Sequence, residues 1–200
     1  MKIVVIGSNG LIGKAVVRAL EPRHEVVGAS RKGRIQVDLC DEASIEALFR
    51  TVKDIDAVVS CAGSGAWKPL DQLTTEDFET SLHYKLMGQV NLARTAARHL
   101  RDGGSITLTS GVLARQPVKG GAAISLVNAG LEGFAVGASI ELPRGLRINV
   151  VSPPWMSESL AEMGLPPAGG IPAAQCAHSY VAAVEGTMTG KTLDARDFVR

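Results

Sequence analysis

The sequence predicts an α/β domain in which a doubly wound parallel sheet of about seven strands is covered by helices on both faces. Three observations lead to this fold class. Short runs rich in β-branched residues alternate with longer amphipathic runs along the chain. The strand-like runs are apolar at consecutive positions, as in strands that are buried on both faces. Finally, the first of these runs leads directly into a glycine-rich turn and a helix, which is how a βαβ unit begins.

The expected elements alternate as strand and helix from the N-terminus. We place the strands at Ile3–Ile6, Glu25–Gly28, Ile35–Val37, Ala57–Ser60, Ser105–Thr109, Arg147–Val151 and Lys191–Leu193. We place the helices at Leu11–Leu20, Glu42–Thr51, Thr75–Leu100, Gly121–Leu142 and Ala173–Glu185. Doubly wound connectivity then predicts the strand order 3-2-1-4-5-6-7. We expect a single domain over residues 1–200, with a loop at Gly164–Pro172 and a peripheral tail after Asp194.

Composition and charge argue against several classes of function. The chain has a net charge of +1, from 21 basic and 20 acidic residues, so no charge excess favours nucleic acid or an anionic membrane as partner. The first strand is too short for a signal peptide, and we expect no apolar run long enough to cross a bilayer. Cys40, Cys61 and Cys176 are odd in number and lack CxxC spacing, which predicts reduced cysteines, a cytoplasmic location and no metal site.

The turn Gly7-Ser8-Asn9-Gly10-Leu11-Ile12-Gly13 predicts a phosphate-binding site of the Rossmann type. Glycines let the backbone turn sharply and approach an anion, and Gly13 lets the helix lie close to the strand. The start of the helix presents unpaired N–H groups and the positive end of the helix dipole. We therefore expect these seven residues to bind the pyrophosphate of a dinucleotide.

The end of the second strand predicts which dinucleotide is bound. NAD-binding domains usually carry an acid there, which accepts a hydrogen bond from the ribose 2′-hydroxyl. This chain has no acid at positions 28–32, and Ser30, Arg31 and Lys32 are suited instead to a 2′-phosphate. The expected cofactor is therefore NADP(H). Asp38 either accepts from the adenine amino group or caps the helix at Glu42–Thr51, and we include Asp38 and Leu39 in the expected cofactor site.

Several segments, in order along the chain, resemble the short-chain dehydrogenase/reductase family. Ser60-Cys61-Ala62-Gly63 is similar to the family's Asn-Asn-Ala-Gly segment, Thr109-Ser110-Gly111 to its catalytic serine after the fifth strand, and Leu146 to Pro153 to the turn that contacts nicotinamide. The resemblance implies that Cys61, Ala62, Gly63 and Pro153 also contact the cofactor. It implies an oxidoreductase that reduces a small carbonyl compound or oxidises the alcohol. It also implies a homodimer or homotetramer built on the two long helices.

The chain departs from this family at its catalytic pair. By resemblance, the position of the family's proton-donating Tyr is Ile124, the position of its Lys is Asn128, and the position of an Asn on the preceding helix is Lys85. We hypothesise that Lys and Asn have exchanged helices, so that Lys85 and Asn128 form the catalytic set while Ser110 polarises the carbonyl. The proton then comes either from Lys85, whose pKa desolvation lowers, or from water held by Ser110 and Asn128.

Other interpretations stay open from the sequence alone. Loss of the Tyr and Lys is also expected in a catalytically inactive NADP(H) sensor or regulator, and a non-redox isomerisation or elimination is a third class. Tyr84 is a weaker candidate for the proton donor, since neighbouring helical residues point about 100° apart. Trp155 and Met156 are expected to form an apolar wall of a small substrate pocket. The sequence does not name the substrate.

Overall fold

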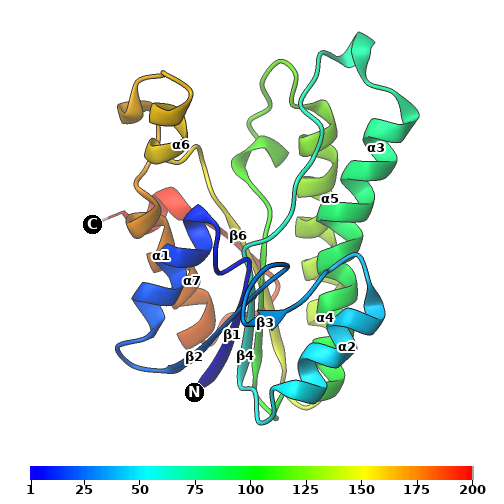
Figure 1. The fold of residues 1–200 in the computed structure, drawn as a ribbon, viewed down its shortest axis with the longest axis vertical. Helices are drawn as coiled ribbons and strands as arrows, with labels where there is room; N and C mark the ends of the chain where they lie inside the picture. Colours follow the sequence, from blue (N-terminus) through cyan, green and yellow to red (C-terminus); the bar gives the residue numbers. More distant parts are fainter. Residues whose placement is uncertain (200) are drawn as a thin grey trace.

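The fold is built on one parallel sheet, and the computed structural model describes residues 1–199 (Figure 1). The strands are β1 (Lys2–Ile6), β2 (Glu25–Ser30), β3 (Ile35–Gln36), β4 (Ala57–Ser60), β5 (Ser105–Thr109), β6 (Arg147–Ser152) and β7 (Lys191–Asp194). They are hydrogen-bonded in the order β3-β2-β1-β4-β5-β6-β7, and every pairing is parallel. The predicted fold class and strand order are confirmed.

Helices cover both faces of the sheet (Figure 1). They are α1 (Leu11–Leu20), α2 (Glu42–Thr51), α3 (Thr75–Ser81), α4 (Gly88–His99), α5 (Ala122–Ser139), α6 (Ser157–Glu162) and α7 (Ala173–Glu185). The helices α1 and α7 cover one face, where Ile3 and Val5 of β1 belong to the core. The helices α2, α4 and α5 cover the other face, where Val4 and Ile6 are buried. Successive residues of one strand therefore serve opposite cores.

The single helix expected at Thr75–Leu100 consists of three consecutive segments, so that prediction is wrong in its detail. Between α3 and α4 lies a π-helix at Leu82–Met87. A π-helical turn adds a residue to the turn and changes the direction of the side chains that follow, and it often marks a functional site. Lys85 lies within this turn.

The C-terminal tail also differs from the expectation. A 3₁₀ helix at Ala195–Phe198 follows β7 and packs against α7, and the Ala195 side chain is fully buried. Ala195 and the partly buried Phe198 therefore join the core on the α1 and α7 face, whereas Arg196, Asp197 and Val199 stay exposed.

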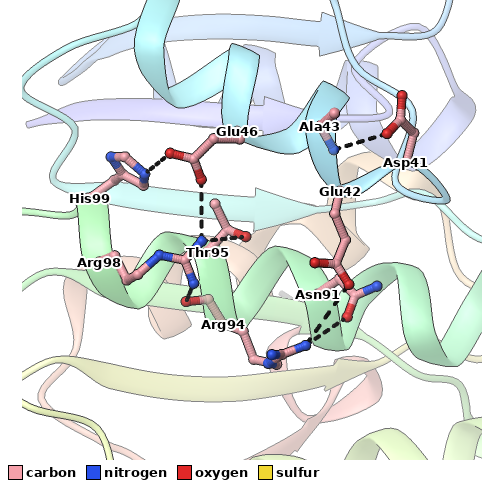
Figure 2. A network of polar contacts seen from close by, with 9 residues as sticks. All are labelled: Asp41, Glu42, Ala43, Glu46, Asn91, Arg94, Thr95, Arg98 and His99. Atoms are coloured by element: carbon pink, nitrogen blue, oxygen red, sulfur yellow. Dashed lines mark hydrogen bonds and ion pairs between the residues drawn. The ribbon is translucent and has the colours of Figure 1, made fainter.

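Polar contacts join α2 to α4 on the outside of their layer (Figure 2). Glu46 of α2 accepts from the Arg98 guanidinium at 3.2 Å and lies 2.8 Å from His99 Nε2. The His99 ring in turn stacks on Phe49, with the ring centroids 5.2 Å apart. Exposed ion pairs contribute about 0–1 kcal/mol each, so apolar packing, rather than charge, holds these two helices together.

The helix α5 is unusually apolar for its degree of burial. Over its 18 residues the mean hydropathy is 1.2, and it is the one helix of residues 1–199 that satisfies the length and composition of a membrane span. The expectation that no apolar run is long enough is therefore wrong, although core helices often satisfy the same criterion. Only 28% of α5 is buried, and its outer face exposes Leu126, Val136 and Ile140.

Candidate active site

The predicted phosphate-binding turn connects β1 to α1. Gly7 has a φ of +79°, and a Cβ atom there would lie 3.0 Å from the Cys61 carbonyl group. A Cβ atom on Gly13 would lie 2.1 Å from the Gly7 oxygen, so a side chain fits at neither position. Over residues 1–199, the N–H groups of Leu11, Ile12 and Gly13 have no hydrogen-bond acceptor. This cradle of free donors at a helix N-terminus fits a pyrophosphate.

A cavity of about 750 Å³ extends from this turn along the ends of β1 and β2. It brings together many of the predicted cofactor residues, namely Gly7, Asn9, Gly10, Ser30, Arg31, Lys32, Asp38, Leu39, Cys61, Ala62 and Gly63. Ser8, Leu11 and Gly13 contribute no lining. The Ser8 hydroxyl donates to Ala29 O at 3.3 Å, Leu11 is exposed, and Gly13 lies buried beneath the turn.

The far end of this cavity is polar and basic. Asn9 Nδ2 donates to Ser30 Oγ at 2.9 Å, which ties the turn to the end of β2. Arg31 and Lys32 are exposed at the rim. Of the two roles expected for Asp38, capping of α2 belongs instead to Asp41, which accepts from Ala43 N. Asp38 accepts from Cys40 N at 3.0 Å and lines the cavity, so its contact with adenine stays a prediction.

A second cavity of about 320 Å³ adjoins the first, because both are lined by Cys61, Ala62 and Gly63 at the end of β4. Its walls are largely apolar and include Ile12 and Pro153 from the predicted cofactor site. All three predicted catalytic residues also line it, which are Lys85, Ser110 and Asn128.

Two side chains of this smaller cavity are anchored on consecutive carbonyl groups. Lys85 Nζ donates to Ser110 O at 3.3 Å, and Asn128 Nδ2 donates to Gly111 O at 3.3 Å. The hypothesis of an exchange therefore receives a geometric basis, since Lys85 and Asn128 come from different helices and meet at the same turn after β5. Asn128 Oδ1 is buried and has no partner within residues 1–199, so it is an acceptor left open for water or a ligand.

Gly63 and Gln89 position Lys85, one at its side-chain stem and the other at its main chain. Gly63, with a φ of +146°, leaves room for its stem, because a Cβ atom there would lie 3.1 Å from Lys85 Cγ. The buried Gln89 side chain donates to the carbonyl oxygens of Lys85 and Thr109 and accepts from Thr109 N. Gln89 therefore joins the π-helix to Thr109 at the end of β5. The next residue is Ser110, whose carbonyl oxygen accepts from the Lys85 ammonium.

Burial lowers the pKa of Lys85 from 10.5 to about 8. The only cause is desolvation of the ammonium. Within the described part of the chain, no carboxylate forms an ion pair with it. A lysine with a pKa near neutrality exchanges a proton readily, as a general acid or base must.

Ser110 lines the smaller cavity, but its hydroxyl is bonded to a carboxylate, so its expected role in polarising a carbonyl stays a prediction. Ser110 N donates to Val151 O, so the strand geometry of β5 continues through this residue. Its Oγ donates to Glu132 Oε1 at 3.0 Å. Glu132 is itself paired with Arg115 at 3.6 Å, which keeps its carboxylate a strong acceptor. The hydroxyl proton that was expected to polarise a carbonyl is therefore given to Glu132.

The next position also faces the site. A Cβ atom on Gly111 would lie 2.9 Å from Asn128 Nδ2, so a side chain there would point at the Asn128 amide. Only glycine leaves this space free. Ser110 and Gly111 thus contribute the carbonyl groups that anchor Lys85 and Asn128, and Gly111 leaves open space beside them.

The two tyrosines have separate positions. Tyr84 is 42% exposed and lines the larger cavity, away from the residues that anchor Lys85. Tyr180 is buried, and its hydroxyl lies 2.9 Å from Thr109 Oγ1. Burial raises the pKa of Tyr180 well above its usual value. Neither tyrosine lines the smaller cavity beside Lys85.

Sequence reasoning missed three residues of the site, which are Trp67, Gln89 and Glu132. Gln89 had a local signal, since it is a polar residue one turn after Lys85 on an otherwise buried helix face. Glu132 had a weaker signal, as an acidic residue one turn after Asn128 in the same helix. Trp67 had none, because it enters the smaller cavity from a loop after β4 and its position depends on the tertiary structure.

The fold and the glycine turn define a dinucleotide-binding α/β domain, and comparison with known proteins defines its family. The family model described as Enoyl-(Acyl carrier protein) reductase matches residues 6–181. The short-chain dehydrogenase/reductase ATR9 of Stachybotrys chlorohalonatus is 31% identical over 84% of this chain and 67% of its own. Hydroxynaphthalene reductase arp2 of Aspergillus fumigatus is 33% identical over 60% of this chain. The chain spans only 45% of the length of that second relative.

Solved structures agree with this assignment. The protein lin1944 from Listeria innocua has a TM-score of 0.92 and 37% identity, covering 97% of this chain and 98% of that one. A small-chain dehydrogenase in complex with NADPH has a TM-score of 0.85 and 28% identity, covering 97% and 95%. The chain belongs to the short-chain dehydrogenase/reductase family.

The partly buried ammonium of Lys85 predicts a gain in stability when it is removed. We expect Lys85→Met to raise the free energy of unfolding at pH 7 by roughly 1–3 kcal/mol, because Lys85 is charged there and its desolvation opposes folding. The folded pKa lies below the unfolded one. The cost is therefore complete below pH 8 and shrinks as the pH rises towards 10.5.

Urea titrations of the parent protein and of Lys85→Met, at pH 7 and again near pH 10.5, measure the difference in their free energies of unfolding. The exposed Lys119→Met is the matched control and should change little at either pH. A Lys85→Met protein that is less stable than the parent, or a difference independent of pH, would contradict the prediction.

Proposed function

We propose that this chain is an NADP(H)-dependent oxidoreductase that reduces a small carbonyl compound or oxidises the alcohol, with Lys85 as the proton donor and acceptor. The observation that carries the proposal is the convergence of Lys85 and Asn128 on consecutive carbonyl groups in one cavity. That cavity adjoins a larger one lined by the glycine turn. The catalytic set is therefore Lys85 and Asn128, without a hydroxyl from Ser110.

NADP(H) suits the larger cavity better than NAD(H). No acid stands at the end of β2, where a ribose 2′-hydroxyl would be recognised, whereas Ser30, Arg31 and Lys32 provide a hydroxyl and two cations. A similar structure, the small-chain dehydrogenase, is in complex with NADPH. The turn from Gly7 to Gly13 would hold the pyrophosphate, and Cys61, Ala62, Gly63 and Pro153 would lie beside the nicotinamide. When bound, this cofactor supplies or accepts the hydride.

The residues of the smaller cavity account for the proton. The Lys85 ammonium donates it to the carbonyl oxygen as the alcohol forms, and the neutral amine takes it back in the reverse direction. A pKa of about 8 makes both steps accessible near neutral pH. Asn128 Oδ1 is free to accept from a bound hydroxyl or from water, and Ile124 only closes the wall.

A regulator that binds NADP(H) without turnover is the second candidate. It is favoured by the loss of both family hydroxyls, since Ile124 has none and Ser110 gives its proton to Glu132. Tight NADPH binding with no reduction of any ketone or aldehyde would support this alternative and contradict the enzyme.

We further propose a homo-oligomer in a reducing, cytoplasmic compartment, acting as a single domain on a small molecule. The three cysteines are free thiols, and burial raises the pKa of Cys176 to about 12, which keeps it unreactive. The outer face of α5 combines exposed apolar side chains with Gly133 and Gly137, where an added Cβ atom would meet nothing within 4 Å. A second copy would cover this face.

Replacement of Arg31 tests the choice of cofactor. We expect Arg31→Ala to raise the KM for NADPH about tenfold and to leave the KM for NADH nearly unchanged, because it removes a charged hydrogen bond to the 2′-phosphate. Initial rates with both cofactors measure the effect. Lys53→Ala removes an exposed cation before β4, at the opposite edge of the sheet, and serves as the control. An equal change for both cofactors would refute a 2′-phosphate site at Arg31.

Replacement of Lys85 tests the proton donor. We expect Lys85→Met and Lys85→Arg each to lower kcat for carbonyl reduction at least about 100-fold, since Arg keeps the charge but does not release its proton. In the parent protein, reduction should slow as the pH rises above 8, because the ammonium is then lost. NADPH binding, followed by cofactor fluorescence, should persist in both variants. Full activity of either variant would exclude Lys85 as the donor.

Replacement of Val136 tests the oligomer. Val136 is 57% exposed on the outer face of α5, so Val136→Glu would bury a charge if a second copy covered this face. We expect a smaller molar mass in light scattering after size-exclusion chromatography. Val118→Glu, at an apolar residue exposed in the loop before α5, is the control. An unchanged mass for Val136→Glu would argue against this interface.

A further inference from the structure

Both tryptophans of the chain lie at the smaller cavity. Trp67 follows β4 and Trp155 follows β6, so residues far apart in the sequence meet here. Their rings contact edge to face, with centroids 5.5 Å apart and an angle of 63° between the planes. Trp67 is 44% exposed and Trp155 is 37% exposed. Two large aromatic surfaces therefore stay partly in contact with water at the opening of the cavity.

Much of the remaining wall of this cavity is apolar. It includes Val112, Leu113, Ile124 and Pro154. Apolar walls with a few placed polar groups are typical of small-molecule sites, and aromatic side chains prefer an aromatic partner in edge or offset contact. A flat aromatic ring would cover this surface more completely than a small aliphatic chain.

The charges at the cavity disfavour reduction of an anionic substrate, because its carboxylate would compete with its carbonyl group for Lys85. Among residues 1–199, Lys85 is the one cation that lines the cavity, and no acid does. The next guanidinium, Arg115, is paired with Glu132 and donates to Ser152 Oγ at 3.2 Å. A carboxylate on the substrate would therefore pair with Lys85 and displace the carbonyl oxygen that Lys85 must reach.

We propose that the smaller cavity selects an uncharged ketone whose carbonyl group is attached to an aromatic ring, with the ring against Trp67 and Trp155 and the carbonyl oxygen at Lys85. This inference rests on the proposed reduction. In the reaction the carbonyl carbon gains a hydride from NADPH, the C=O double bond becomes single, and the oxygen gains a proton from Lys85 Nζ. The products are the secondary alcohol and NADP⁺, and the Lys85 amine regains a proton from water.

Three ketones that share one skeleton separate the contributions. Acetophenone is uncharged and aromatic, cyclohexyl methyl ketone is uncharged and saturated, and phenylglyoxylate is aromatic and carries a carboxylate. We expect kcat/KM with NADPH to be about tenfold higher for acetophenone than for the saturated ketone. Phenylglyoxylate should be reduced more slowly than acetophenone. Equal values for the two uncharged ketones, or a preference for phenylglyoxylate, would overturn the proposal.

Variants of Trp155 connect this preference to the aromatic pair. Trp155→Leu should bring the ratio of acetophenone to cyclohexyl methyl ketone close to one, whereas Trp155→Phe should keep most of it. A merely structural role would lower both rates together and leave their ratio unchanged. That result would remove Trp155 from substrate recognition.

A binding measurement keeps this inference separate from the proposed function. Since both tryptophans line the cavity, tryptophan fluorescence of the whole protein reports on this site alone. Acetophenone should quench it in a saturable manner beyond the collisional quenching of N-acetyltryptophanamide, and more strongly than cyclohexyl methyl ketone. Saturable binding without reduction would refute the proposed enzyme and keep the ligand class. Reduction of the saturated ketone without preferential binding of acetophenone would refute the ligand class and keep the proposed enzyme.

Discussion

The close approach of Gly13 to the Gly7 carbonyl is the contact on which the arrangement of the site depends. It allows α1 to begin directly after β1, with its first N–H groups free at the carboxyl edge of the sheet. Because parallel strands all end at the same edge, the segments after β4, β5 and β6 open beside this turn. The two adjoining cavities follow from that geometry, and the cofactor cradle and the Lys85 site share the end of β4.

The desolvation of Lys85 lowers the stability of the folded protein. A partly buried ammonium without a carboxylate opposes folding, and its hydrogen bond to the Ser110 carbonyl offsets part of this cost. The π-helix at Leu82–Met87 and the Gln89 side chain attach it to the end of β5, and Gly63 gives its stem room. Functional groups are commonly retained at such a cost in stability. The same desolvation brings the Lys85 pKa into the range useful for proton transfer.

Much of the fold was predictable because it depends on local periodicity. Apolar runs at β1, β4 and β5 and the amphipathic patterns of α1, α2 and α7 have the expected bounds within a residue. The Thr75–Leu100 prediction failed at the π-helix, because its hydrophobic pattern remains helical through the extra residue. The larger cavity was also largely predictable, since Gly7, Asn9 and Gly10 lie in one turn and Ser30 to Lys32 follow one strand. The contact of the Ser110 hydroxyl with Glu132 was not predictable, because it depends on strand pairing with Val151 and on the position of α5.

By itself, the sequence determined the class of fold, the order of the strands and the glycine turn between β1 and α1. Each of these depends on neighbours in the chain or on the identity of one residue. Only the tertiary structure decided that Lys85 and Asn128 meet on the carbonyls of Ser110 and Gly111, and that Trp67 joins Trp155. These contacts bring together loops and helices that are distant in the chain. Their geometry is set by packing around the sheet, which no local pattern encodes.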